Sequence, residues 1–119
     1  MRPAPYSLVL YRGDTARYQF RLWADTAKTV PCDLTGVRAA AQVMDKPSGT
    51  AILDFVCTVT LPNIVDVVLP ANVSRNLPTK GGVWDLQLTY PSLDVVTVLA
   101  GKVCVTADVT ESVLVPMPV

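Results

Sequence analysis

The chain has 119 residues, half of them hydrophobic and 17% charged, and its ten basic and ten acidic side chains cancel. This length is enough for one domain with a proper core, and the apolar content excludes an intrinsically disordered chain. A net charge of zero disfavours binding to nucleic acid or to an anionic membrane, and the apolar runs are too short for a transmembrane helix.

The first part of the chain predicts an extended arm followed by two strands. Residues 1–6 contain two prolines, which restrict the backbone to extended conformations, and we treat them as an N-terminal arm. Residues 8–11 form a short strand, and residues 12–14 turn the chain. Polar and apolar residues then alternate strictly over residues 15–23, which predicts a strand. Its apolar face consists of Ala16, Tyr18, Phe20 and Leu22.

The next strands are separated by short polar turns. Residues 30–32 are a candidate short strand, and residues 37–44 alternate again, with Val37, Ala39, Ala41 and Val43 inward. Residues 45–50, DKPSGT, carry the proline and the glycine of a turn. Residues 51–60 are expected to form one strand with a bend near Asp54.

The second half predicts a strand, a short helix and a long hairpin. Residues 64–69 are rich in β-branched side chains, with Asp66 facing outward. Prolines bracket residues 71–77, where one or two helical turns fit. Residues 81–106 contain two long strands joined by a turn, and Gly101 marks a bulge or a point of close backbone approach.

These elements predict an all-β domain of seven to eight strands with one short helix, the pattern of a β-sandwich or a barrel. We place the domain at residues 7–110 and a C-terminal arm at residues 111–119. The prolines of this arm argue against a central strand. Its apolar side chains are unfavourable in water and are expected to contact a neighbouring subunit. They are Val113, Leu114, Val115 and Met117.

The residue types that usually carry catalysis or metal binding are sparse. Histidine is absent, which removes the commonest general base and the commonest metal ligand. Cys32, Cys57 and Cys104 are odd in number and widely spaced, so we interpret them as reduced, mostly buried side chains, although one disulfide pair stays open. The acidic residues are scattered and are expected to cap turns or face solvent. The sequence therefore predicts no enzyme, no cofactor and no metal.

Two short motifs and two tryptophans require interpretation. RGD at residues 12–14 matches an integrin-binding tripeptide, and NVS at residues 72–74 matches a glycosylation acceptor, but a turn and the predicted helix explain them. Trp84 alternates with the inward set and is assigned to the core. Trp23 falls on the polar face at a strand end, so we treat it, together with Tyr6, as a candidate interface residue.

Six phrases, taken in chain order, carry a family resemblance. They are LYRGDTARYQFRLW, PCDLTGVRAAAQVMD, SGTAILDF, VDVVLPANVSRNLP, GGVWDLQLTY and VLAGKVCVTADVT. Over about residues 8–110 this layout resembles small virion proteins of tailed bacteriophages, and it is similar to the immunoglobulin-like N-terminal domain of baseplate upper proteins. The antibody spacing of cysteine, tryptophan and cysteine is not met, so an immunoglobulin-like topology here is of the disulfide-free kind.

The resemblance implies a non-enzymatic structural component of the virion, assembled in the host cytoplasm in many symmetric copies. Such domains attach to neighbouring virion subunits, and we expect a tail, baseplate or fibre-attachment adaptor. Baseplate upper proteins continue into a stalk, whereas this sequence stops soon after the domain, so a freestanding adaptor and a capsid decoration (cement) protein are both consistent. A carbohydrate- or receptor-binding module is the alternative from another class.

Overall fold

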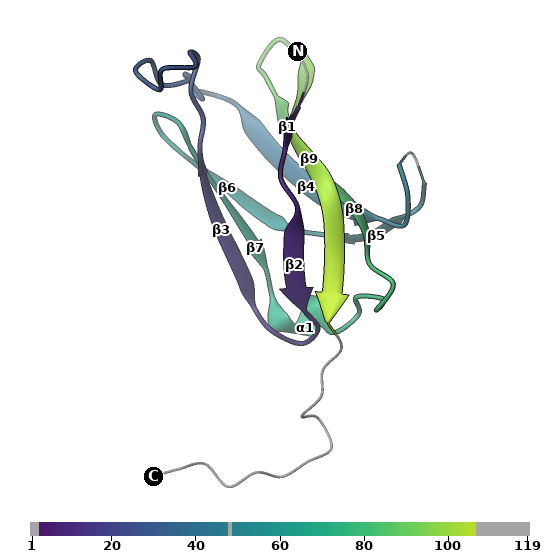
Figure 1. Cartoon of the computed structure of the whole chain (residues 1–119). Helices are drawn as coiled ribbons and strands as arrows, with labels where there is room; N and C mark the ends of the chain where they lie inside the picture. Colours follow the sequence, from purple (N-terminus) through teal and green to yellow (C-terminus); the bar gives the residue numbers. More distant parts are fainter. Residues whose placement is uncertain (1–2, 48, 107–119) are drawn as a thin grey trace, which may run out of the picture.

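The structure is a computed structural model of the chain, and it describes residues 3–47 and 49–106. Nine strands in these residues form two sheets, with one short helix at an end of the sandwich (Figure 1). Sheet A consists of β1 (Ala4–Pro5), β2 (Leu8–Tyr11), β4 (Arg38–Met44), β5 (Ala51–Asp54), β8 (Gly82–Thr89) and β9 (Val95–Thr106). Sheet B consists of β3 (Ala16–Arg21), β6 (Val56–Thr60) and β7 (Ile64–Leu69).

The strand order is that of an immunoglobulin-like sandwich. Sheet A has the order β1-β9-β8-β4-β5, with β2 also beside β9, and sheet B has the order β3-β7-β6. β1 and β2 run parallel to β9, whereas the other neighbours are antiparallel. Successive segments pass from one sheet to the other and cover a shared core. The predicted fold class is confirmed.

The strand expected over residues 51–60 divides between the two sheets. β5 pairs with β4 in sheet A, and β6 pairs with β7 in sheet B. Phe55 lies between them, is buried, and donates its N–H to the carbonyl of Ala41 at 2.9 Å. The bend predicted near Asp54 is therefore a change of sheet. This division and the additional strand β1 explain why nine strands form where seven to eight were expected.

The core follows the predicted alternation along each strand. Val65, Val67 and Leu69 of β7 and Leu86 and Leu88 of β8 are at most 1% exposed. Fully burying side chains of this size contributes about 1.5–3 kcal/mol each. The inner faces predicted for residues 15–23 and 37–44 lie in or against this core. With the exception of the exposed β1, full or partial burial of one face of each strand thus holds the two sheets together.

The short helix is α1 (Ala71–Ser74), and its position agrees with the prediction near residues 71–77. Pro70 precedes it with φ −64°, a value that already suits a helix start. Leu77, 1% exposed, anchors the chain after the helix. Within the described residues, no helix has the length and the apolar composition needed to cross a membrane.

The long hairpin forms as predicted, but its bulge and its glycine occupy different places. The register between β8 and β9 shifts at Leu86 and Gln87, away from Gly101. Gly101 instead lies against the backbone of residues 6 and 7. An added Cβ there would lie 2.6 Å from the carbonyl carbon of Tyr6 and 3.1 Å from the nitrogen of Ser7. Of the two roles predicted for Gly101, the structure selects close backbone approach.

Residues 4–6, which the sequence places in an arm, belong to the domain. Ala4 and Pro5 pair with β9, and the N–H of Tyr6 donates to the carbonyl of Ala100 at 3.0 Å. The extended conformation that the prolines impose is thus used to add an edge strand, a position where proline is tolerated. Residues 1–2 and the predicted C-terminal arm, residues 111–119, lie outside the described residues.

Candidate protein-binding surface

Four aromatic side chains form a cluster where the edges of the two sheets meet, and a fifth, Phe55, lies with its ring centroid 6.1 Å from that of Trp84. The alternation along β3 places Tyr18 and Phe20 on its inner face, β8 contributes Trp84, and Tyr6 comes from the link between β1 and β2. The ring centroids are 5.2 Å apart for Tyr6 and Phe20 and 6.1 Å apart for Phe20 and Trp84. Pairs at these separations attract by about 0.5–1.5 kcal/mol beyond area burial. Tyr6 is 42% exposed, so the cluster reaches the surface.

Trp84 connects the core to the N-terminal edge of sheet A. Its register partner on β9 is Gly101, which has no side chain to obstruct the indole. The indole Nε1–H donates to the carbonyl oxygen of Tyr6 at 2.6 Å. Trp84 is 2% exposed, which confirms its assignment to the core. The glycine and the tryptophan therefore hold the backbone of residues 6 and 7 against β9.

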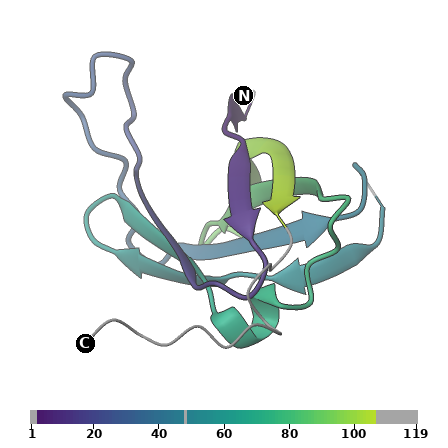
Figure 2. The same cartoon turned by 60° about the horizontal axis from the view of Figure 1, so that its bottom comes forward.

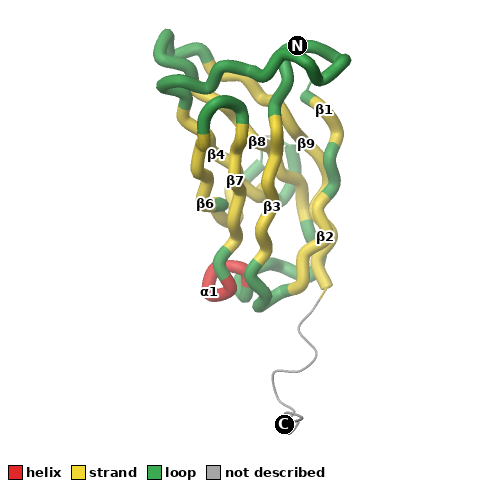
Figure 3. Tube along the Cα trace, turned by 90° about the vertical axis from the view of Figure 1, so that its left-hand side faces the viewer, coloured by secondary structure: helices red, strands yellow, loops and turns green. Residues whose placement is uncertain are grey.

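A strip that we call the β2–β3 seam separates the edge of sheet A at β2 from the edge of sheet B at β3 (Figure 3). In the described residues, no strand lies between these two edges. A cavity of about 240 Å³ occupies the seam, with Leu10, Ala16, Tyr18 and Leu69 among its lining residues. The pKa of Tyr18 is raised, mainly because its side chain is partly buried and also because of the charge interaction with the neighbouring Tyr6. In constant-type immunoglobulin domains the first strand belongs to the sheet of the second strand, whereas here β1 and β2 pair with β9.

The backbone of β3 presents hydrogen-bonding groups to the seam. The N–H of Leu22 donates to the carbonyl of Asn63 at 2.9 Å, which sets the alternation of the ladder between β3 and β7. By the two-residue repeat, the N–H and C=O groups of Arg17, Gln19 and Arg21 point away from β7. Within residues 3–47 and 49–106, the neighbour of β3 in its sheet is β7 alone. Such an edge can pair with an incoming extended chain.

The RGD tripeptide closes one end of the seam. Gly13 has φ 94°, and its N–H donates to the buried Ser74 Oγ of α1 at 2.9 Å. The N–H of Arg12 donates to the carbonyl of Thr106, the last residue of β9, at 2.9 Å. β2 and β9 accordingly end beside α1 (Figures 1 and 2). A structural turn thus accounts for residues 12–14.

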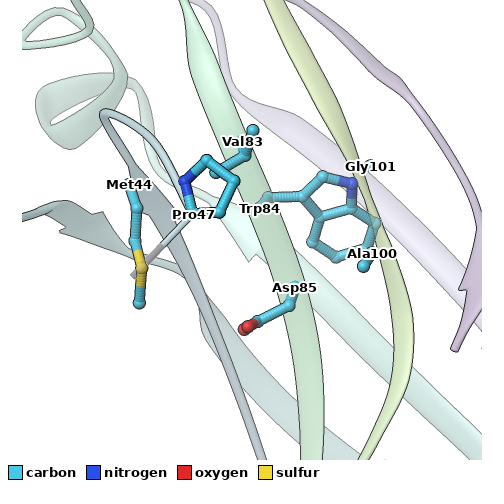
Figure 4. Close-up of a pocket in the computed structure, with 7 residues that line it drawn as sticks. All are labelled: Met44, Pro47, Val83, Trp84, Asp85, Ala100 and Gly101. Atoms are coloured by element: carbon cyan, nitrogen blue, oxygen red, sulfur yellow. The ribbon is translucent and has the colours of Figure 1, made fainter. Parts of the chain in front are cut away.

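A second hollow, of about 450 Å³, lies on sheet A (Figure 4). Met44, Pro47, Val83, Asp85 and Ala100 are among the residues that line it. Asp85 lies on the central strand β8, between Gln42 of β4 and Ala100 of β9. Burial among these apolar walls raises the pKa of its carboxyl group. Among the described residues, no group of three or more carboxylates and thiols is placed to hold a metal ion.

The predicted interface residues fall in three separate places. Tyr6 belongs to the aromatic cluster and is partly exposed. Trp23 lies in the loop between β3 and β4 and forms an isolated bridge with Pro31, where a short strand was expected. The remaining four residues, Val113, Leu114, Val115 and Met117, lie outside the described residues.

The seam was not predicted, although the sequence carries one signal of it. Val9 and Tyr11 on the outward side of β2 are 61% and 57% exposed, while Leu8 and Leu10 are buried. The motif LVLY is thus apolar on both faces of an edge strand. A strand that is apolar on both faces usually lies inside a sheet with both faces covered, so its place at an edge makes this surface a candidate for protein binding.

The acidic residues largely behave as expected, and the cysteines do so only in part. Asp25 accepts hydrogen bonds from Thr29 and Val30, and Asp33 accepts them from Thr35. The side-chain bonds to Thr29 and Thr35, respectively, are the main reason that the pKa values of these two carboxyl groups are lowered. All three cysteines, which lie in the described part of the chain, are free. Cys32 and Cys57 are only partly buried and Cys104 is exposed, so the burial expected for most of the cysteines is not observed.

No protein-family model and no curated protein matches the sequence. Among solved structures, the chain is similar to a chimeric titin Z1Z2 functionalized with a KLER exogenous peptide from decorin. The identity is 14% and the TM-score 0.48, over 86% of this chain and 88% of that chain. The titin domains Z1Z2 in complex with telethonin match with the same two values, over 90% of this chain and 45% of that chain. A likeness at this level says nothing about what the present chain binds.

Proposed function

We propose that this chain is a non-enzymatic structural protein of a tailed-bacteriophage particle, which binds neighbouring virion subunits through the edges of its sandwich. The observation that carries the proposal is the β2–β3 seam, where the exposed Tyr6, Val9 and Tyr11 accompany the outer edge of β3. Exposed aromatic and aliphatic side chains beside a strand edge favour contact with another protein. The resemblance of residues 8–110 to virion domains supports the particle as the setting.

Within the particle we favour a tail, baseplate or fibre-attachment adaptor over a capsid decoration protein. The resemblance to the N-terminal domain of baseplate upper proteins supports this preference. The chain has zero net charge, so its contacts depend on apolar burial and backbone pairing more than on long-range attraction. Repetition of weak contacts in a symmetric assembly makes the whole attachment strong.

Immunogold labelling of whole virions with an antibody raised to this chain tests the proposal. Label at the tail tip or collar is the expected result, and a search for partners would then begin with the fibre proteins. Uniform label on the head would replace the adaptor with a decoration protein. Protein in infected cells without label on particles would overturn the virion role.

Two further measurements separate this proposal from the other classes. A receptor-binding module would depend on Trp23, so Trp23→Ala would abolish binding of the purified protein to host cells. Under our proposal the purified protein has no such binding to lose. Turnover of cell-wall polysaccharide by the pure protein would establish an enzyme instead.

A further inference from the structure

We infer that the β2–β3 seam accepts the C-terminal arm of a second copy of this chain, and that the arm pairs with the outer edge of β3. The inference rests on the proposed function, because it names one neighbour and the contact made with it. Its acceptor is built from described residues. Its donor is residues 107–119, which comprise the C-terminal arm, residues 111–119, and the four residues that join the arm to β9.

The acceptor combines a strand edge with a cavity whose lining is partly apolar. Backbone N–H and C=O groups point toward the seam from Arg17, Gln19 and Arg21. The hydrogen bond from Leu22 to Asn63 shows that the alternate residues of β3 are the ones that bond to β7. The cavity of about 240 Å³ beside this edge is lined by the apolar Leu10, Ala16 and Leu69 and also by polar side chains, among them Asp14, Arg17 and Ser74. An added strand would gain backbone hydrogen bonds from the edge, and every second side chain would enter the cavity.

The arm has the chemistry that this acceptor requires. Val113 and Val115 lie two residues apart, so in an extended chain both project to the same side. The prolines at positions 116 and 118 lack an N–H, which an added edge strand tolerates where its outer side faces solvent. Residues 107–119 carry two acidic and no basic side chains. The exposed face of β3 carries Arg17 and Arg21, which are complementary in charge.

The route of the chain favours a second copy over the seam of the same molecule. β9 ends at Thr106, next to the turn of residues 12–14 that closes one end of the seam. To enter its own seam, the chain would have to reverse around that turn. Residues 105–115 contain no glycine, proline or asparagine, so Asp108 and Ser112 are the residues there that favour such a reversal. Fully extended, residues 107–119 span up to about 43 Å, about twice the length of a six-residue strand such as β3.

Sedimentation equilibrium of the full chain, from about 1 µM to about 1 mM, tests the inference. We expect reversible self-association. Gln19→Pro removes the central N–H of the β3 edge, and V113D combined with V115D places charges on the apolar side of the arm. V113D/V115D should raise the dissociation constant at least about 100-fold, because it removes two buried apolar side chains. Gln19→Pro should raise it about 10-fold, because it removes one backbone hydrogen bond and leaves the acceptor on the arm unpaired.

Matched controls separate these effects from unfolding and from charge. Gln19→Ala keeps the N–H but loses the 3.1 Å hydrogen bond from Gln19 Nε2 to Asp66, and it should associate like the unchanged protein. Ser112→Asp adds charge to the arm without removing an apolar side chain, and it should also associate. Mixing the Gln19→Pro protein, which keeps its arm, with the V113D/V115D protein, which keeps its seam, should restore pairs containing one molecule of each.

Several outcomes overturn the inference. A full chain that stays monomeric across the series, or a Gln19→Pro protein that is folded by circular dichroism yet associates normally, excludes arm pairing at β3. If Gln19→Pro does not fold, the V113D/V115D protein provides the test, and an unchanged dissociation constant for it would refute arm pairing at the seam. Particles that label with antibody while the pure protein stays monomeric refute the second-copy partner and leave the structural role intact. Self-association without any label on particles refutes the structural role alone.

Discussion

Replacing Gly101 with alanine is expected to release residues 4–7 from the edge of sheet A. The new methyl group would overlap the carbonyl group of Tyr6 and crowd the nitrogen of Ser7. The strand β9 is held on its other side by β8, so the N-terminal segment is the part that must move. Its displacement breaks the hydrogen bond from Trp84 to Tyr6 and the pairing of Tyr6 with Ala100.

The magnitude follows from these losses. Two hydrogen bonds contribute about 1 kcal/mol each, and the loss of the Tyr6 ring from the aromatic cluster costs about 0.5–1.5 kcal/mol. Alanine is favoured over glycine within a strand by about 0.5–1 kcal/mol, which offsets part of the loss. The net decrease in the free energy of unfolding is therefore about 1.5–3 kcal/mol.

Urea unfolding followed by far-UV circular dichroism at low protein concentration measures this decrease. Lys102→Ala, an exposed change next to Gly101, is the control and should remain within about 0.5 kcal/mol of the unchanged protein. Trp84→Phe removes the same indole hydrogen bond by another route. The double variant with Gly101→Ala should therefore cost about 1 kcal/mol less than the sum of the two single changes.

Two results would refute this reasoning. A loss below about 0.5 kcal/mol for Gly101→Ala would mean that the N-terminal segment does not lie against Gly101. Fully additive losses in the double variant would mean that the methyl group and the indole do not act through the backbone of Tyr6.

Three other measurements follow from the structure. Burial raises the pKa of Asp85, so the folded protein binds this proton more tightly than the unfolded chain, and the contribution of Asp85 to stability should fall as pH rises above the ordinary value of 3.8. The lowered pKa values of Asp25 and Asp33 act in the opposite direction but are shared by the Asp85→Asn protein, so the comparison of the two proteins isolates Asp85. Asp85→Asn should stabilise the protein at neutral pH, and equal urea midpoints for both proteins at every pH would contradict this prediction. Leu86 is 0% exposed at the centre of β8, so Leu86→Ala should cost about 2–5 kcal/mol in the same unfolding assay, and a cost under about 1 kcal/mol would show a loosely packed core. Cys104 is exposed, whereas burial raises the pKa of Cys57, so a thiol reagent should react with Cys104 first. Cys104→Ala should therefore remove the fast phase of the reaction, and a fast phase that persists would assign the reactive thiol to another cysteine.

Alternation along the chain was sufficient to predict most strands and their inner faces. The strict repeat over residues 15–23 places Tyr18 and Phe20 against the core, and the repeat around Trp84 places its side chain inside. A two-layer sandwich buries one face of each strand, and this requirement acts on nearest neighbours in sequence. The proline before α1 acts equally locally, because it restricts one φ angle.

Tertiary structure alone decided which strands pair and where a strand changes sheet. Backbone groups can pair with any neighbouring edge, so the sequence pattern of residues 4–11 does not reveal that their partner is β9. Nor does the sequence at residue 55 show that the chain stops pairing with β4 there and begins to pair with β7. Gly101 suited both a bulge and a close approach until Tyr6 was placed against it. The β2–β3 seam arises in the same way. Side-chain burial determines which face of a strand turns inward. The seam depends instead on pairing between distant parts of the sequence: β1 and β2 pair with β9, which leaves the edge of β3 without a neighbouring strand on the side of the seam.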